Sequence, residues 1–347
     1  MVLPPFIQYS KYDVDFLPFG DMINVSRLNE YHRVITMEDF MDHLVMNVWP
    51  ERKRSIFCYG ARKVDSTSGI DSCNAHEGSP FRAFWLHSDI RSFPAGSVFY
   101  SPLHTDYNFA DDWIQKYSNY SVIAFVGAPS SFPTNKKAVQ LQRFVHFSDK
   151  LKAKAQSYSE YRGLSRIPYL SIHIRHGQDW LKACELIKKN HDLKSLFSSQ
   201  QCLGSYPEKR VAYDLCLSTF DQIRTWIEST IKNHLEENIQ TIHIATDFEN
   251  ITLWKELHKS FENPLTMVSS THTIHSNGTI TRHEPIDNAL IDLYLMTYSN
   301  IFIGNCISSF SAFVSRYRIY NHHLFEKTFF FAFDDHLNVA HYKHDEL

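Results

Sequence analysis

The sequence predicts an α/β protein made of two Rossmann-like domains, and three observations lead to this prediction. From residue 166 onward, short apolar segments alternate with longer segments of helical periodicity, which is typical of a parallel sheet covered on both faces. The chain has 347 residues, which is long for a single hydrophobic core and sufficient for two. Hydrophobic residues make up 43% and charged residues 21% of the chain, a balance typical of globular rather than disordered proteins.

The predicted elements of the second half follow one another in a regular order. Strands are expected over 169–175, 241–247, 265–269 and 301–305, and helices over 218–236, 251–261, 286–298 and 308–320. The helix over 218–236 carries an apolar stripe formed by Phe220, Ile223, Ile227 and Leu235. The helix over 286–298 carries a similar stripe, formed by Ile286, Leu290, Leu293 and Tyr294.

The first half is less regular, with strands expected over 55–59 and 121–126 and a helix over 37–45. The polar segment 150–166 is interpreted as the connection between the two domains. We therefore expect an N-terminal Rossmann-like domain over 1–158, a C-terminal one over 166–320, and a C-terminal tail over 321–347.

Composition excludes several classes of function. The formal net charge of −3 provides no strong positive field for a nucleic-acid backbone. No apolar run approaches the length of about 18 residues that a membrane span needs. Glycine is scarce, at 11 residues, and no glycine-rich phosphate loop is found. We therefore expect neither a nucleic-acid-binding protein nor a membrane-spanning one.

The C-terminus and the cysteines both indicate the lumen of the endoplasmic reticulum. The chain ends with a tetrapeptide of the retrieval type, His344-Asp345-Glu346-Leu347. Six cysteines, an even number without a CxxC pair, favour disulfides over zinc binding. Four sequons would permit N-glycosylation in that compartment, at Asn24, Asn119, Asn250 and Asn277. The N-terminus does not have the features of a signal peptide.

Two strand ends carry residues suited to bind a phosphorylated ligand, because ligands of parallel sheets lie at the carboxyl ends of the strands. The strand over 169–175 ends at Arg175, and a guanidinium group can hold a phosphate through two hydrogen bonds. The alternative is a structural ion pair between Arg175 and Asp179.

The strand over 301–305 leads into a helix whose first amides have no partner within the helix and can bind a diphosphate. Ser308 and Ser309 add hydroxyl groups there. The alternative is ordinary N-capping by Ser308.

Asp292 lies in the helix before this second strand end, and a carboxylate can accept two parallel hydrogen bonds from guanine. The alternative is a solvated helix residue, and Asp247 is a weaker candidate for the same contact. Three histidines, His272, His275 and His283, are interpreted as part of an exposed polar loop rather than as a metal site.

Five segments closely resemble the GDP-fucose protein O-fucosyltransferases that act on EGF-like domains. They are HIRHGQDW (173–180), FIGNCISSFSAFVSR (302–316), YHRVITMEDFM (31–41), EGSPFRAFW (77–85) and GAPSSFP (127–133). The resemblance implies a GT-B fold, with two Rossmann-like domains facing a cleft. It also implies inverting transfer of fucose from GDP-fucose to Ser or Thr of folded EGF-like domains of Notch-type proteins, in the endoplasmic reticulum. No cofactor or metal is expected.

The resemblance assigns GDP-fucose binding to six residues: His173, Arg175, Asp292, Ser308, Ser309 and Phe310. Arg175 would stabilise the negative charge that grows on the departing GDP. Asp292 would recognise guanine, and Asp179 and Asp247 would support the site. The resemblance also implies three disulfides, which pair Cys58 with Cys73, Cys184 with Cys216, and Cys202 with Cys306.

The chain matches the family from the family's second strand onward. We therefore expect it, as written, to lack the signal peptide, the first β–α unit and a GRFGNQ-type loop, and to retain affinity for GDP. Two alternatives to the EGF-directed enzyme stay open. One is an O-fucosyltransferase for thrombospondin repeats, and the other is a catalytically silent lumenal chaperone for EGF-like domains.

Overall fold

The structure is a computed structural model that describes residues 1–9, 14–58, 63–64, 71–76, 80–101, 110–127, 136–189, 216–248, 250–284, 289–305 and 308–330. The chain divides into two compact units. The first comprises Met1–Ser131 and Phe144–Ser148, and the second comprises Phe132–Arg143 and Asp149–Leu347.

The second unit is built on a seven-stranded sheet with the order β13-β12-β11-β10-β9-β14-β15. Its parallel strands are β9 (Tyr169–Ile174), β10 (Thr241–Thr246), β11 (Thr266–Val268), β14 (Ile301–Gly304) and β15 (Thr328–Phe330). Strands β12 (His272–Ile274) and β13 (Ile280–Arg282) extend one edge in antiparallel fashion. The four strands predicted for this half are confirmed.

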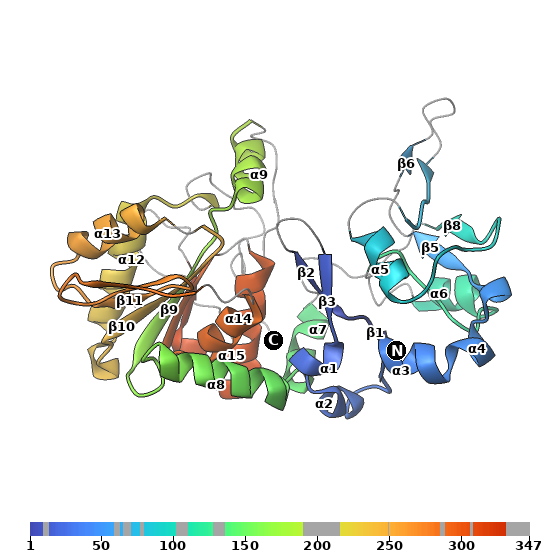
Figure 1. Ribbon diagram of the computed structural model, residues 1–347, viewed down its shortest axis with the longest axis horizontal. Coiled ribbons are helices and arrows are strands. Elements are labelled where there is room, and N and C mark those ends of the chain that lie inside the picture. Colours follow the sequence, from blue (N-terminus) through green and yellow to red (C-terminus); the bar gives the residue numbers. More distant parts are fainter. Residues whose placement is uncertain are drawn as a thin grey trace. The chain divides into compact units, whose positions relative to one another are not determined.

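Helices lie on both sides of this sheet (Figure 1). The helices described for this unit are α7 (Lys136–Val139), α8 (Asp149–Tyr161), α9 (Gln178–Lys189), α12 (Phe220–Asn233), α13 (Ile251–Ser260), α14 (Ala289–Tyr298) and α15 (Ser309–His322). Thr219 and Gln222 form a capping box at the start of α12, and the Asn250 side chain caps α13. The four helices predicted here are confirmed, and α9 is an additional one.

The two faces of the sheet differ in chemistry. In β9, Leu170, Ile172 and Ile174 belong to the hydrophobic core that includes residues of α12 and α13. The alternate residues Ser171 and His173 are equally buried but polar. Figure 1 shows α12 and α13 on one side of the sheet and α14 and α15 on the other. Because neighbouring strand residues point to opposite faces, the polar residues face α14 and α15.

Three expectations about individual elements were wrong. Segment 150–166 does not connect the two units, because it belongs to the second unit; it is largely helix α8, which contacts α14 and buries Leu151, Ala155 and Tyr158. Segment 121–126 forms only an isolated bridge, between Phe125 and Phe57. The expected polar loop with the three histidines is the β12–β13 hairpin, held by strand pairing and by a hydrogen bond between Thr273 and His283.

The first unit contains short strand pairs. Strand β1 (Val2–Leu3) pairs in parallel with β4 (Ile35–Thr36), and β5 (Ile56–Cys58) pairs in parallel with β8 (Val98–Tyr100). Antiparallel pairs join β2 (Phe6–Tyr9) to β3 (Val14–Leu17) and β6 (Lys63–Val64) to β7 (Asp71–Ser72). The strand predicted over 55–59 corresponds to β5.

Short helices accompany these strands. They are α1 (Phe19–Met22), α2 (Val25–Asn29), α3 (Met37–His43), α4 (Val45–Val48), α5 (Phe81–His87) and α6 (Ala110–Tyr117). The helix predicted over 37–45 corresponds to α3, which Thr36 caps. A core around Ile56, Trp85 and Ile90 holds the unit together.

Two of the three expected disulfides are present, Cys58–Cys73 and Cys184–Cys216. Cys202 and Cys306 lie outside the described residues, as does the tetrapeptide His344–Leu347. Among the helices that the structure describes, none is long and apolar enough to cross a membrane.

Candidate functional site

The carboxyl ends of β9, β10 and β14 lie side by side, because these three strands are parallel neighbours in the sheet. Arg175 follows β9, Asp247 follows β10 and Asn305 follows β14. Residues about 70 and 130 positions apart in the chain are thereby brought to one edge of the sheet, where parallel α/β sheets bind their ligands.

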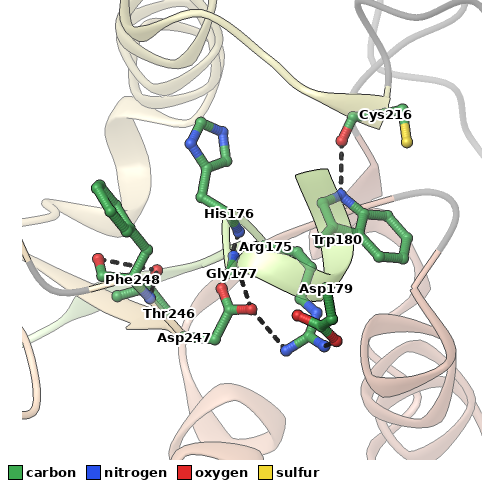
Figure 2. Close-up of polar contacts among 9 residues, drawn as sticks. All are labelled: Arg175, His176, Gly177, Asp179, Trp180, Cys216, Thr246, Asp247 and Phe248. Atoms are coloured by element: carbon green, nitrogen blue, oxygen red, sulfur yellow. Dashed lines mark hydrogen bonds and ion pairs between the residues drawn. The ribbon is translucent and has the colours of Figure 1, made fainter. Parts of the chain in front are cut away.

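Asp247 organises the turn that follows β9. Its Oδ1 accepts a hydrogen bond from the backbone N–H of His176 (2.8 Å), and its Oδ2 accepts one from that of Gly177 (2.9 Å). The same Oδ2 lies 2.6 Å from Nη1 of Arg175. Figure 2 shows the carboxylate between the Gly177 backbone and the Arg175 guanidinium. One carboxylate therefore sets both the turn and the arginine at its tip.

The close approach of Asp247 explains why residue 177 is glycine. A Cβ atom there would overlap Asp247 Oδ2 and lie 2.9 Å from Asp179 Oδ1. The turn that follows β10 is stabilised by its own side chain, because Phe248 N–H donates to Oγ1 of Thr246 (3.1 Å). The sequence analysis gave Asp247 as a weaker candidate for the guanine contact and as a supporting residue. In the structure, its carboxylate forms an ion pair with Arg175.

Asp179 holds the other side of the guanidinium. Its Oδ2 accepts a hydrogen bond from Arg175 Nη2 (2.6 Å), but its side chain is 72% exposed, whereas that of Asp247 is 22% exposed. The predicted ion pair with Asp179 is therefore present, and Asp247 forms a second, better shielded one. The Arg175 side chain itself stays 31% exposed.

Trp180 anchors the helix that carries Asp179. Its ring lies 5.9 Å from the Arg175 guanidinium carbon, and its Nε1–H donates to the carbonyl oxygen of Cys216 (2.8 Å; Figure 2). The disulfide between Cys184 and Cys216 joins the same two segments. Helix α9 is thus fixed near Arg175 by covalent and polar contacts.

His173 connects the end of β9 to the first turn of α15. Its Nδ1 lies 2.7 Å from Ser311 Oγ, and its ring centroid lies 5.1 Å from that of Phe310. Burial, with a smaller effect from the positive charge of Arg175, lowers the pKa of His173 to about 3. The imidazole is therefore neutral near pH 7, and it serves as a hydrogen-bonding partner rather than a cation.

The start of α15 is arranged by Asn305 rather than by a capping serine. Ser308 is the N-cap residue but its side chain makes no capping hydrogen bond. Instead, Asn305 Oδ1 accepts from Ser308 N–H (3.2 Å), and Asn305 N–H donates to Ser311 Oγ (2.9 Å). The capping alternative for Ser308 is therefore wrong. The first helical amides are left without a serine cap and keep their capacity for an anion.

Asp292 is not simply a solvated helix residue. It lies in the first turn of α14, and its Oδ1 is 3.2 Å from Nε2 of His243, a residue with no exposed surface. Sequence reasoning missed His243 and Asn305. A signal for His243 was available, since it stands as a polar residue inside the apolar strand TIHIAT.

The four candidate N-glycosylation sites differ in their exposure. Asn119 and Asn277 are exposed, whereas the side chains of Asn24 and Asn250 cap helices α2 and α13. Within the described ranges, no group of three or more His, Cys, Asp or Glu side chains is arranged to hold a metal ion.

The chain matches a family model described as GDP-fucose protein O-fucosyltransferase over residues 1–321. It is 27% identical to GDP-fucose protein O-fucosyltransferase 1 of Caenorhabditis elegans over 92% of its own length and 78% of that protein. It also resembles the crystal structure of POFUT1 in complex with GDP-fucose, with 26% identity, coverage of 95% of this chain and 89% of that one, and a TM-score of 0.75.

A structure of POFUT1 in complex with GDP gives a TM-score of 0.74 at 26% identity, covering 95% of this chain and 88% of that one. These similarities extend over nearly the whole chain and include its α/β architecture, which is of the GT-B type. The chain belongs to the GDP-fucose protein O-fucosyltransferase family and is a glycosyltransferase that uses GDP-fucose as donor.

Proposed function

We propose that the enzyme transfers fucose, with inversion, from GDP-fucose to a Ser or Thr hydroxyl of folded EGF-like domains of Notch-type proteins. The observation that carries this proposal is the geometry around Arg175. Asp247 holds this guanidinium at the carboxyl end of β9, and His173, two residues earlier, contacts the first turn of α15. An arginine and a helix N-terminus thus lie at one edge of the sheet, a combination suited to a diphosphate.

In the proposed reaction, the acceptor hydroxyl forms a new bond to the anomeric carbon of fucose while the bond from that carbon to the β-phosphate oxygen breaks, and the hydroxyl proton is released to water. GDP departs with additional negative charge. Arg175 and the first amides of α15 stabilise this charge, which is greater in the transition state than in the bound donor. His173, neutral at physiological pH, keeps the strand end and the helix in register.

The remaining site residues take roles in donor recognition. Asp292 accepts hydrogen bonds from the ring N–H and the amino group of guanine, which adenine cannot offer as a pair. Ser308, Ser309 and Phe310 border the nucleotide at the start of α15. The donor set proposed for the diphosphate consists of Arg175, the serine hydroxyls and the first amides of α15.

The acceptor class and the compartment are proposed from the sequence. The segments that resemble EGF-directed enzymes span both halves of the chain, and the terminal tetrapeptide His344–Leu347 is a retrieval signal for the endoplasmic reticulum. Disulfides such as Cys184–Cys216 are stable in that oxidising lumen, where EGF-like domains also acquire their own disulfides.

A transfer assay tests the proposal. The full chain is incubated with GDP-fucose and one of three acceptors: a folded EGF-like domain, the same domain after reduction, and a folded thrombospondin repeat. We expect fucose on the folded EGF-like domain alone. Transfer to the thrombospondin repeat alone would identify the related acceptor class. Binding of the EGF-like domain without any transfer would indicate the chaperone function.

A further inference from the structure

Three polar side chains form a continuous hydrogen-bonded row on the buried face of the sheet. Ser171 of β9 and His243 of β10 are directly opposite each other in the parallel pairing, and Ser171 Oγ lies 3.0 Å from His243 Nδ1. On the other side of the ring, His243 Nε2 lies 3.2 Å from Asp292 Oδ1. Ser171 and His243 have no exposed surface, whereas the Asp292 side chain is 19% exposed. The row leads from the sheet interior to a carboxylate at the surface.

The direction of the hydrogen bond at Asp292 follows from its chemistry. An ionised carboxylate only accepts hydrogen bonds, so His243 Nε2 carries the proton in either charge state of the ring. Ser171 occupies the other ring nitrogen, which prevents the ring from turning over without the loss of a buried hydrogen bond. His243 is therefore held in one orientation and donates to one chosen oxygen of Asp292.

This arrangement leaves most of the carboxylate available. Among the described residues, the Asp292 side chain accepts one hydrogen bond, that from His243, and it engages Oδ1 alone. Oδ2 and the second lone pair of Oδ1 can still accept hydrogen bonds. A base that offers two parallel N–H groups needs both oxygens in a fixed plane, and a carboxylate tied at one oxygen has little freedom to rotate out of that plane.

A purely structural role would not require this chemistry. The neighbouring positions on the opposite face of β10 are isoleucines, Ile242 and Ile244, which fill buried space without a polar group. Burying an imidazole with both nitrogens paired is favourable only where both partners are present. Two further residues lie near the row: buried Arg162 interacts electrostatically with Asp292, and the Tyr169 ring lies 6.4 Å from that of His243.

We propose that His243 is a positioning residue for donor selectivity, which orients Asp292 toward the guanine base and is itself oriented by Ser171. This inference rests on the proposed function, in which Asp292 recognises guanine. Its test compares two substitutions, each of which places an amide group at the position of one of the two ring nitrogens. In His243→Gln, the side-chain amide reaches the place of Nε2 and can still donate to Asp292. In His243→Asn, the shorter amide reaches only the place of Nδ1 and Ser171.

Dissociation constants for GDP, IDP and ADP would be measured by calorimetry on the full chain and on each variant. IDP lacks the 2-amino group of guanine, so the ratio of IDP to GDP constants reports the contact at that group. ADP reports the diphosphate site and the integrity of the fold. We expect His243→Asn to lower the ratio about 10-fold, the order of one hydrogen bond to a charged group. We expect His243→Gln to stay within about 2-fold of the parent and Ser171→Ala to give a smaller loss in the same direction.

Two further variants separate the possible outcomes. Asp292→Asn should lower the ratio at least as much as His243→Asn does. His258→Asn, the same change at a buried histidine of α13, should leave the ratio unchanged. If Asp292→Asn lowers the ratio but His243→Asn and Ser171→Ala do not, the positioning role is wrong and the guanine contact stands. If Asp292→Asn leaves the ratio unchanged, the guanine contact and the inference both fail. Equal losses in His243→Gln and His243→Asn would also overturn the inference.

Discussion

Replacing Asp247 by asparagine tests the central feature of the site, the carboxylate that holds Arg175. Asparagine keeps one acceptor oxygen, which can retain the bond to the His176 amide. Its NH₂ group then faces two donors, the Gly177 amide and the Arg175 guanidinium, which the native Oδ2 contacts at 2.9 and 2.6 Å. The substitution therefore removes one hydrogen bond and one ion pair of the carboxylate and introduces a donor where an acceptor is needed.

The size of the effect follows from burial. A hydrogen bond to a charged group contributes about 1.5–3 kcal/mol, and water recovers part of this because the side chains of Asp247 and Arg175 are 22% and 31% exposed. We expect a net loss of about 2–3 kcal/mol of transition-state stabilisation. This corresponds to a decrease of about 30- to 160-fold in kcat/KM for fucose transfer.

Asp179→Asn is the matched control. Asp179 contacts the same guanidinium at the same distance of 2.6 Å, but its side chain is 72% exposed. An exposed ion pair contributes about 0–1 kcal/mol, so its loss should reduce kcat/KM by less than about 5-fold. The two distances to the guanidinium are equal, so the expectations differ because Asp247 is better shielded and also accepts from the Gly177 amide.

Initial rates of transfer from GDP-fucose to a folded EGF-like domain would be measured for both variants, together with thermal unfolding. Asp247→Asn should lower the rate while most of the chain stays folded. Equal reductions in both variants, or an unchanged rate in Asp247→Asn, would refute the argument that the shielded carboxylate positions Arg175.

Three further predictions concern other parts of the second unit. Arg175→Ala should abolish detectable transfer, because it removes about 3–4 kcal/mol of transition-state stabilisation from the departing GDP, and it should leave the thermal unfolding curve nearly unchanged. A variant that keeps more than half of the parent rate would exclude this role of Arg175. His173 has a folded-state pKa of about 3 against 6.5 in the unfolded chain, so the unfolded chain binds the proton first. The free energy of unfolding should therefore fall as the pH drops below about 6.5, by up to about 1.4 kcal/mol per pH unit from this group. In His173→Asn, denaturant titrations at a series of pH values should show a smaller decrease of this free energy with falling pH. Arg318 is fully buried and donates to backbone carbonyls that include those of Met296, Ser299 and Lys327. Arg318→Leu should therefore lower the free energy of unfolding by about 4 kcal/mol or more, and a loss below about 1 kcal/mol would contradict its role as donor to these carbonyls.

The sequence determined the elements of the second unit and the edge at which its site lies. A strand of a parallel sheet is buried on both faces, so segments such as Tyr169–Ile174 stand out as apolar runs between longer amphipathic helices. The polar residues that follow each strand must then meet at one edge. Arg175 and the start of α15 were predicted on this ground, and the resemblance to the family supplied the donor.

Helix α8 shows where composition was misleading. Its sequence is mostly polar, which suggested a connection, but Leu151, Ala155 and Tyr158 recur at helical spacing and are buried. This stripe is narrow, because the helix packs on one side only against its neighbours, including α14. Average polarity along a segment therefore did not reveal that the segment was folded.

The partners of each site residue were decided only by the tertiary structure. Asp247 binds the amides of His176 and Gly177 because β9 and β10 pair with residue 174 opposite residue 246, a register that composition does not encode. The same register places Ser171 opposite His243. A one-residue shift would turn every side chain of the strand to the other face, and this row with Asp292 would not form. Local sequence thus specified which residues lie at the strand ends, and the packing of strands and helices across long chain separations specified which of them touch.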